Sequence, residues 1–466
     1  MAIVTLEPLS LAEAEAEIHA HIFSRAAEQD HEAKMRRVAK ALDYLGDPQD
    51  DLRVIHVTGT NGKTSTSRMT AALLGAQGLK VGLFTSPHLH TLRERIQVGG
   101  SPLEQAELVR LWHTVAPAIH RVDAYSARIG GPRMSFFEVL TVLGLVAFSQ
   151  ARVDVAVIEV GIGGARDATN VCEGEVAVLT PMGIDHDEYF GGTIEGVATE
   201  KAGIIKSHAT VVTAVQADAV ATIVTAVARR ESATPVWEGA QMSVISSEPV
   251  AGGQVMTLAT AADTYPDIFL PMHGAFQVHN ALLALAAVEA FVGCGVPCSL
   301  DARTVAAGFA AASSPGRLEV AANAPLVVLD AAHNPHGVAA LAGAAREVLG
   351  DRATVGVIAV LADKDARGIL VGVSGLVDRV VITRTSSDRA LSVEDLERLA
   401  VEALGAHRVE SAADVSLAIA RARDLAGPEG AVLVTGSITL IAKAREVLGM
   451  TLRGVGQAGD AASVLA

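Results

Sequence analysis

The fold is decided by one stretch, Arg53-Val54-Ile55-His56-Val57-Thr58-Gly59-Thr60-Asn61-Gly62-Lys63-Thr64-Ser65. An apolar, β-branched run comes first, a glycine turn follows it, and helix-forming residues continue from Arg68 to Leu74. This order predicts a strand, a tight loop and a helix. Such a loop points backbone N–H groups and the N-terminus of a helix at one place, which suits a phosphate group.

The loop therefore predicts a nucleotide-binding site. Lys63 would reach the β- and γ-phosphates, and the hydroxyl of Thr64 would meet a Mg²⁺ ion. Val57 stands where the stricter pattern GxxxxGK[ST] has its first glycine, so the alternative is an ordinary glycine turn. We favour phosphate binding because a predicted strand precedes the loop, a predicted helix follows it, and the Lys-Thr pair stands at the positions that the pattern requires. The loop residues predicted to bind the nucleotide are Gly59, Thr60, Asn61, Gly62, Lys63, Thr64 and Ser65.

Charge and cysteine content narrow the range of partners and compartments. Acidic residues outnumber basic ones by 52 to 37, which argues against nucleic acid or an anionic membrane as a partner. Cys172, Cys294 and Cys298 form neither a disulfide framework nor a zinc spacing, which fits free thiols in a reducing cytoplasm; a Cys294–Cys298 disulfide is the alternative. The first residues resemble no signal peptide, and the longest apolar run, 139–148, is too short to span a bilayer. We expect a cytoplasmic monomer that acts on small molecules.

Three polar side chains stand at or after the ends of other predicted strands. Ser86 follows the second strand, Glu159 lies near the end of the third, and His186 follows the fourth. Because the carboxyl ends of parallel strands meet at one edge of a sheet, these side chains are candidate metal ligands. A buried carboxylate is costly unless it is paired or bound to a metal, which favours a Mg²⁺ ligand at Glu159. The alternatives are a turn serine at Ser86 and an ordinary loop histidine at His186.

Other segments in roughly the first 300 residues carry weaker signals. Residues 10–45 predict about one helical segment, and residues 211–264 predict short strands and turns without chemical signatures. A long helix is expected to begin near His273, with Gln277 and Asn280 in its first turn, where helix capping competes with nucleotide contact.

The C-terminal part predicts a domain of its own. Residues 311–319 are small and turn-rich, and strands alternate regularly with helices beyond them. We therefore expect an α/β protein: an N-terminal P-loop NTPase-like domain with a mostly parallel sheet, and a smaller, doubly wound, Rossmann-like C-terminal domain. No glycine-rich dinucleotide fingerprint follows the first C-terminal strand, so this is not a NAD domain. The predicted divisions are residues 1–312, a linker at 313–322, and residues 323–466.

Ten motifs, in this order, resemble those of the folylpolyglutamate synthase/dihydrofolate synthase family, within the Mur-type ATP-dependent amide ligases. They are IHVTGTNGKTS, TSPHL with ERI, EVGIGG with DATN, IDH, EKAGI, HGAFQVHN, PGRLE, DAAHNP, DKD and VTGS. The resemblance extends over almost the whole chain. It implies ATP and two Mg²⁺ ions as cofactors, and ligation of L-glutamate to dihydropteroate, to tetrahydrofolate, or to both, through an acyl phosphate.

The resemblance also implies roles for single residues. Asn280, Arg317 and Asp330 would contact the nucleotide. Lys201 matches a lysine that this group carries as a metal-binding carbamate, although a surface Glu-Lys pair is the alternative. The implied catalytic residues are Lys63, Glu159, His186, Lys201 and His333, and the implied metal ligands are Ser86, Glu159, His186 and Lys201. The implied substrate contacts are Ser86, Pro87, His88, Phe136, Phe137, His333 and Ser437; for the two phenylalanines, core packing is the alternative.

Two departures from the family pattern limit what can be carried over. The family commonly reads GGR-x-DATN, whereas here the arginine is Arg166, one position later, which puts in doubt a substrate contact by that side chain. Ile438 and Thr439 follow VTGS instead of the frequent Leu-Tyr.

Two other functions compete with this interpretation. A cell-wall Mur ligase usually carries a separate N-terminal domain, for which the early P-loop leaves no space. A P-loop nucleotide-binding module without ligase chemistry would not need His186, Lys201 or the appended domain.

Glu159→Gln is expected to abolish turnover and to leave the fold intact, because an amide lacks the charge that a carboxylate offers to Mg²⁺. Phosphate release from Mg-ATP measures turnover, and circular dichroism checks the fold. Normal activity in the folded variant would exclude the metal role.

Overall fold

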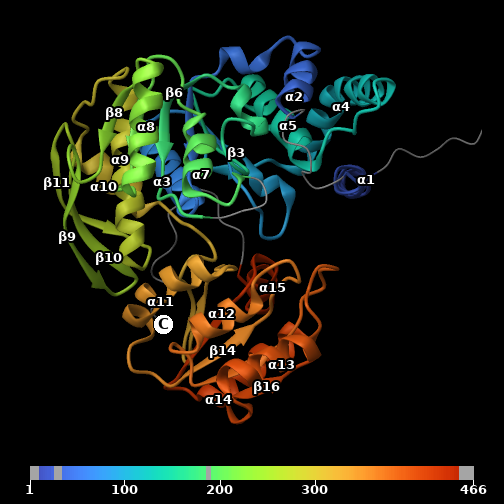
Figure 1. The fold of residues 1–466 in the computed structure, drawn as a ribbon, viewed down its shortest axis with the longest axis vertical. Helices are drawn as coiled ribbons and strands as arrows, with labels where there is room; N and C mark the ends of the chain where they lie inside the picture. Colours follow the sequence, from blue (N-terminus) through green and yellow to red (C-terminus); the bar gives the residue numbers. More distant parts are fainter. Residues whose placement is uncertain (1–9, 26–33, 185–189, 451–466) are drawn as a thin grey trace, which may run out of the picture.

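The predicted strand and helix of the opening stretch lie at the centre of a large sheet (Figure 1). The structure is a computed structural model that describes residues 10–25, 34–184 and 190–450. Strand β1 (Val54–Thr58) pairs in parallel with β5 and β6, and the order in the sheet is β4-β3-β2-β5-β1-β6-β7-β8. The other strands are β2 (Val81–Phe84), β3 (Ile96–Val98), β4 (Ser101–Pro102), β5 (Val155–Glu159), β6 (Gly174–Leu179), β7 (Thr210–Thr213) and β8 (Thr234–Trp237).

Helices cover both faces of this sheet, because the buried strands are apolar on both sides. Ile55 and Val57 of β1 pack with α3, α9 and α10 on one face, and Val54 packs with α2, α4 and α5 on the other. Helices α7 and α8 cover β6 and β7. The helices are α1 (Leu11–Phe23), α2 (Lys34–Asp43), α3 (Lys63–Ala76), α4 (Gln105–Arg128), α5 (Phe136–Ala151), α7 (Ile194–Ala202), α8 (Asp218–Arg230), α9 (Ala275–Val292) and α10 (Ala302–Ala310).

Helix α9 is long and apolar enough to cross a membrane by length and composition, and it is the only such helix among the described residues. Its apolar window is 78% buried inside the protein, where it packs against α3. A helix that is apolar all round belongs to a core. We therefore interpret α9 as the core helix of the first domain.

A three-stranded antiparallel sheet packs beside α9 and α10, in the order β11-β10-β9. Its strands are β9 (Ser243–Val250), β10 (Gly253–Ala259) and β11 (Thr264–Leu270). Met256 and Leu258 of β10 join the same core as α3, which fixes this sheet to the domain.

The C-terminal part forms a second α/β unit below the first in Figure 1. Its sheet has the order β12-β13-β17-β14-β15-β16, and only β12 runs antiparallel. Helices α11, α12 and α13 cover one face, and α14 and α15 cover the other. The elements are β12 (Glu319–Asn323), β13 (Leu326–Leu329), α11 (Pro335–Leu349), β14 (Thr354–Ile358), α12 (Ala366–Val373), β15 (Arg379–Ile382), α13 (Val393–Leu404), β16 (Val409–Ser411), α14 (Val415–Ala426), β17 (Ala431–Thr435) and α15 (Ile438–Val447).

The α/β class with two mostly parallel sheets is confirmed, and three local predictions need correction. The lead-in contains two described helices, α1 and α2, rather than about one helical segment. The stretch 211–264 contains the 13-residue helix α8, whose short apolar face (Val220, Val224, Ala228) gave a weak periodic signal. Strand β12 lies largely inside the predicted linker 313–322, because pairing with β13 makes it the edge of the second sheet.

Gly82→Ala is expected to destabilise the protein by about 1–3 kcal/mol, because overpacking forces neighbours to shift. A Cβ on Gly82 in β2 would lie 2.6 Å from the Phe148 ring of α5. The matched control is Gly75→Ala in α3, where a Cβ meets nothing within 4 Å. There alanine should stabilise the helix by roughly 0.5–1 kcal/mol. Thermal unfolding midpoints that moved equally in both variants would contradict the packing argument.

Candidate active site

The loop between β1 and α3 is held in place by close contacts at two glycines. Gly59 has φ +149°, and a Cβ there would lie 1.8 Å from the hydroxyl oxygen of Thr180. Gly62 has φ +89°, and a Cβ there would lie 2.4 Å from Oδ1 of Asn280. Both positions require glycine, because a left-handed backbone and the lack of space exclude a side chain. The second turn of α9 therefore touches the loop directly.

The polar side chains of the loop point inward. Lys63 Nζ donates to the carbonyl oxygens of Gly59 at 2.8 Å and Thr60 at 3.1 Å. The Thr64 hydroxyl donates to Oε1 of Glu159 at 2.7 Å. The backbone N–H of Ser86 donates to Oε2 of Glu159 at 3.0 Å. The start of α3 and the loop after β2 are thus joined to the end of β5 through one carboxylate.

The Glu159 carboxylate is 1% exposed. Burial raises its pKa, while the positive charge of Lys63 and the donors on Ser86 and Thr64 oppose that change. The side-chain oxygens of Glu159 and Thr64 suit Mg²⁺, because a carboxylate and a hydroxyl are hard oxygen ligands. They lie 2.7 Å apart and leave coordination positions for phosphate oxygens and water. Within the described ranges, no group of three or more His, Cys, Asp or Glu residues could hold a metal ion. A magnesium site at Glu159 would therefore need phosphate oxygens of the nucleotide as further ligands.

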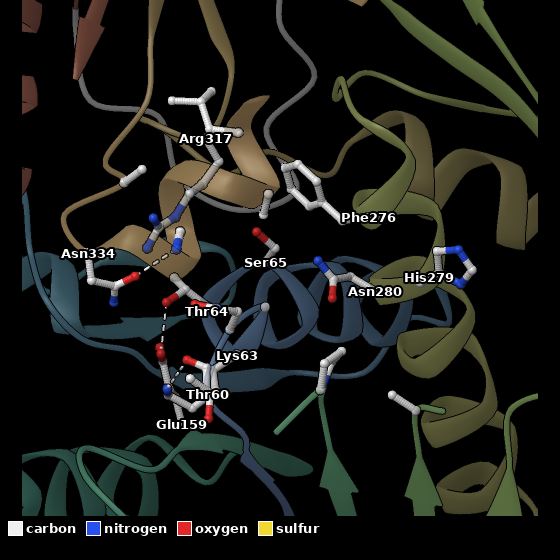
Figure 2. Close-up of a pocket in the computed structure, with 18 of the residues that line it drawn as sticks. Thr60, Lys63, Thr64, Ser65, Glu159, Phe276, His279, Asn280, Arg317 and Asn334 are labelled. Atoms are coloured by element: carbon white, nitrogen blue, oxygen red, sulfur yellow. Dashed lines mark hydrogen bonds between the residues drawn. The ribbon is translucent and has the colours of Figure 1, made fainter. Parts of the chain in front are cut away.

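A cavity of about 470 Å³ opens above this loop, between the two α/β units. Figure 2 shows Lys63 and Thr64 near its centre, Arg317 and Asn334 on one side, and Phe276, Asn280 and His279 on the other. Thirteen of the predicted site residues line it: Thr60, Asn61, Gly62, Lys63, Thr64, Ser65, Ser86, Pro87, Glu159, Asn280, Arg317, Asp330 and His333. The structure therefore brings most of the predicted P-loop residues, the predicted nucleotide contacts Asn280, Arg317 and Asp330, and the side chains of Ser86, Glu159 and His333 to one cavity.

The second α/β unit reaches the cavity through Arg317. The Asp330 carboxylate accepts from the N–H groups of Leu318 and Ala332, both at 2.9 Å. Burial raises the pKa of Asp330, and the charge of Arg317 and these two donors oppose that change. Ser314 is tied to the P-loop helix by a 3.0 Å hydrogen bond between its hydroxyl and that of Ser65. The linker is therefore fixed at both ends of the turn that carries Arg317.

Lys201 lies beneath the loop rather than on the cavity wall. It is 5% exposed, and its Nζ donates to the carbonyl oxygen of Gly59 at 2.9 Å, the oxygen that Lys63 also contacts. The displaced Arg166 binds Glu200, the neighbour of Lys201, through its backbone N–H and its Nε, each at 2.8 Å. His186, the predicted second metal ligand, lies outside the described residues.

The predicted substrate contacts divide into two groups. Ser86, Pro87 and His333 line the cavity, whereas His88, Phe136, Phe137 and Ser437 are not on its described lining. Phe137 packs in the core, 5.7 Å from the Phe84 ring, as the alternative of core packing predicted. The Ser437 hydroxyl caps α15 by accepting from the N–H of Leu440 at 3.2 Å.

His88 and Phe136 meet at a buried arginine, Arg95. Arg95 donates from Nε to His88 Nδ1 at 2.7 Å, and its guanidinium lies 5.1 Å from the Phe136 ring. Burial lowers the pKa of His88 to about 3, so its imidazole is neutral. Burial also lowers the pKa of Arg95 to about 10, against the attraction of Glu159 and Glu94. Arg95 is therefore a buried cation held against His88 and the ring of Phe136.

Sequence reasoning missed part of the cavity wall. Phe276 and His279 lie in the quoted motif HGAFQVHN, and Asn334 lies in DAAHNP, but no role was predicted for these three residues. Glu238 directly follows β8, so the rule of strand ends would have found it had that strand been recognised. The hydrogen bond that the His279 ring forms to the Glu238 carboxylate raises the pKa of His279.

Comparisons with known proteins agree with this geometry. Residues 57–288 match the Mur ligase middle domain, and residues 316–438 match the Mur ligase, glutamate ligase domain. The chain is 43% identical over 437 residues to dihydrofolate synthase/folylpolyglutamate synthase of Mycobacterium tuberculosis, covering 89% of this chain and 90% of that protein.

Solved structures are similar as well. A Mycobacterium tuberculosis folylpolyglutamate synthase complexed with ADP and AMPPCP has a TM-score of 0.89 and 40% identity, over 95% of this chain and all of that one. A solved FPGS–AMPPCP–folate complex has a TM-score of 0.81 and 31% identity, over 94% of this chain and all of that one.

Gly62→Ala is expected to weaken nucleotide binding more than about tenfold, because the new Cβ displaces the loop from Asn280. The matched control is Gly78→Ala, which has φ +83° but nothing within 4 Å of the new Cβ. Both variants carry the same backbone strain, and only the first touches the site. Calorimetric titration with ADP measures the affinity, and equal affinity in both variants would contradict the assignment of the loop.

Proposed function

The chain belongs to the folylpolyglutamate synthase/dihydrofolate synthase family of Mur-type ligases, and we propose from this premise how its residues divide the reaction. The protein is an ATP-dependent ligase that joins L-glutamate to folates, as the motifs predicted. A cell-wall ligase and a nucleotide-binding module without ligase chemistry are not favoured.

One observation carries the proposal. The buried Glu159 carboxylate, held by Thr64 and Ser86, lines the same cavity as Arg317 from the linker to the second unit. Such an arrangement suits phosphoryl transfer, in which catalysis depends mostly on positioning and on neutralising charge. Thr64 and Glu159 would hold magnesium, which supplies charge neutralisation at the phosphates.

Lys63 and Arg317 would stabilise the charge of the transferring phosphoryl group. A carboxylate is a poor acylating agent, so the acid is first phosphorylated by ATP to an acyl phosphate. The amine of L-glutamate then attacks the acyl carbon, an amide bond forms, and phosphate leaves. Lys63 lies on the P-loop and Arg317 on the linker, so both cations converge only when the two units are together.

The acid substrate would enter beside Ser86 and Pro87. We assign its carboxylate end to this side because Arg95 adds a buried cation there, next to His88 and the ring of Phe136. L-glutamate would bind on the second unit near His333, whose Nδ1 is 2.9 Å from the carbonyl oxygen of Ala331, and near Ser437. Lys201, as a carbamate, and His186 would complete a second metal site.

Domain closure would protect the acyl phosphate from water. Leu89, in the loop after β2, packs against the core of α14 and α15 in the second unit. This contact and the Ser65–Ser314 hydrogen bond join the first unit to the linker and the second unit. We place the division between the units at 312/313, so that β12 belongs to the second, and we propose a cytoplasmic monomer with one chain supplying the whole site.

The test is phosphate release from Mg-ATP and L-glutamate, with dihydropteroate or tetrahydrofolate supplied separately. Release with both acceptors is expected if the enzyme adds the first glutamate and also extends folates. Release with one acceptor assigns the single activity. Leaving out L-glutamate is the control, because a nucleotide hydrolase would release phosphate without it. No glutamate-dependent release with either acceptor, from protein that binds ADP, would contradict the proposal.

A further inference from the structure

The cavity has a second arm that the reaction just described does not use. On one side of the P-loop lie Ser86, Glu159 and Arg317, which serve phosphoryl transfer. On the other side lie Phe276, His279 and Asn280 of α9 (Figure 2). Because the γ-phosphate must face Glu159, the ribose and the base of the nucleotide extend into this second arm. The inference below rests on the proposed function, since it concerns the same nucleotide.

The second arm is built at three neighbouring strand ends. Residues following β6, β7 and β8 supply one wall, and α9 and α11 supply the other. Most of its side chains are apolar, which suits the flat faces of a purine. The apolar lining residues are Pro181, Ala214, Val215, Phe276, Ala340 and Leu341.

Two polar side chains, Glu238 and His279, line the same arm. The Glu238 side chain is 6% exposed, and its Oε1 forms a hydrogen bond with Nδ1 of His279. Its Oε2 accepts from the backbone N–H of Val215 at 3.3 Å. The histidine side chain is 50% exposed, so it reaches from the solvent to the buried carboxylate. The carboxylate is thus held from two sides and offers only acceptor sites.

We propose that Glu238, positioned by His279, selects adenine over 6-oxopurines as the base of the nucleotide. The purine is joined to ribose at N9, and ribose lies toward the P-loop, so the edge with the 6-substituent points away from the P-loop, toward Glu238. The 6-amino group of adenine donates a hydrogen bond to the carboxylate. The 6-oxo group of hypoxanthine or guanine has only lone pairs there, so the buried carboxylate loses a donor and meets a second acceptor.

The test compares ADP with IDP, which differ in the 6-position of the purine and in the proton at N1. Calorimetric titration is expected to show that the wild type binds ADP about 100-fold more tightly than IDP, the scale expected when a buried acceptor loses its donor. Glu238→Gln should reduce this ratio at least about tenfold, because its amide can donate to the 6-oxo group. The same change should appear in kcat/KM for ATP against ITP.

Glu248→Gln is the matched control, because Glu248 is an exposed carboxylate on β9, and it should leave the ratio unchanged. His279→Gln is the second variant, at a half-exposed position that tolerates substitution, and it should lower the ratio by freeing Glu238. If folded Glu238→Gln shows the same ratio of ADP to IDP affinity as the wild type, the inference about Glu238 is wrong and the proposed function stands. If Glu238→Gln does not fold, an unchanged ratio in His279→Gln has the same consequence. Failure of the wild type to bind ADP overturns the nucleotide site and with it the proposed function.

Discussion

The structure depends on one packing constraint: the loop between β1 and α3 fits between Thr180 and Asn280 with no space for a side chain at Gly59 or Gly62. Thr180 directly follows β6, and Asn280 stands in the second turn of α9. The loop therefore fixes the distance between the central sheet and the core helix.

The second unit is attached to the same loop by few but specific contacts. Ser314 binds Ser65 of the P-loop helix, and Asp330 holds the backbone on the far side of Arg317. A cation on a linker that is fixed at both sides can neutralise charge on a phosphoryl group without reorganising. The chemistry of the site thus follows from how the linker is held, and Glu159 receives its opposite charges from both units.

Sequence reasoning failed for side chains whose surroundings are supplied by other segments of the fold. Of the adjacent pair Phe136 and Phe137, one ring lies against Arg95 and the other is in the core, a difference that depends on which face of α5 each occupies. The displaced Arg166 was left without a role, and only the fold shows that Glu200, 34 positions away, is its partner. Helix α8 was missed because its apolar face is short.

The sequence by itself determined the strand-loop-helix of the P-loop and the two α/β units, because glycine turns, β-branched runs and strand-end side chains are local signals. The order of its motifs determined the family, and local signals and family resemblance together identified thirteen residues of the cavity. Only the tertiary structure decided the rest: the joining of Thr64, Ser86 and Glu159 around one carboxylate, the burial of Arg95 and the pairing of Glu238 with His279. These contacts link segments distant in the chain, and their burial and charge exist only once the strands are ordered in the sheet.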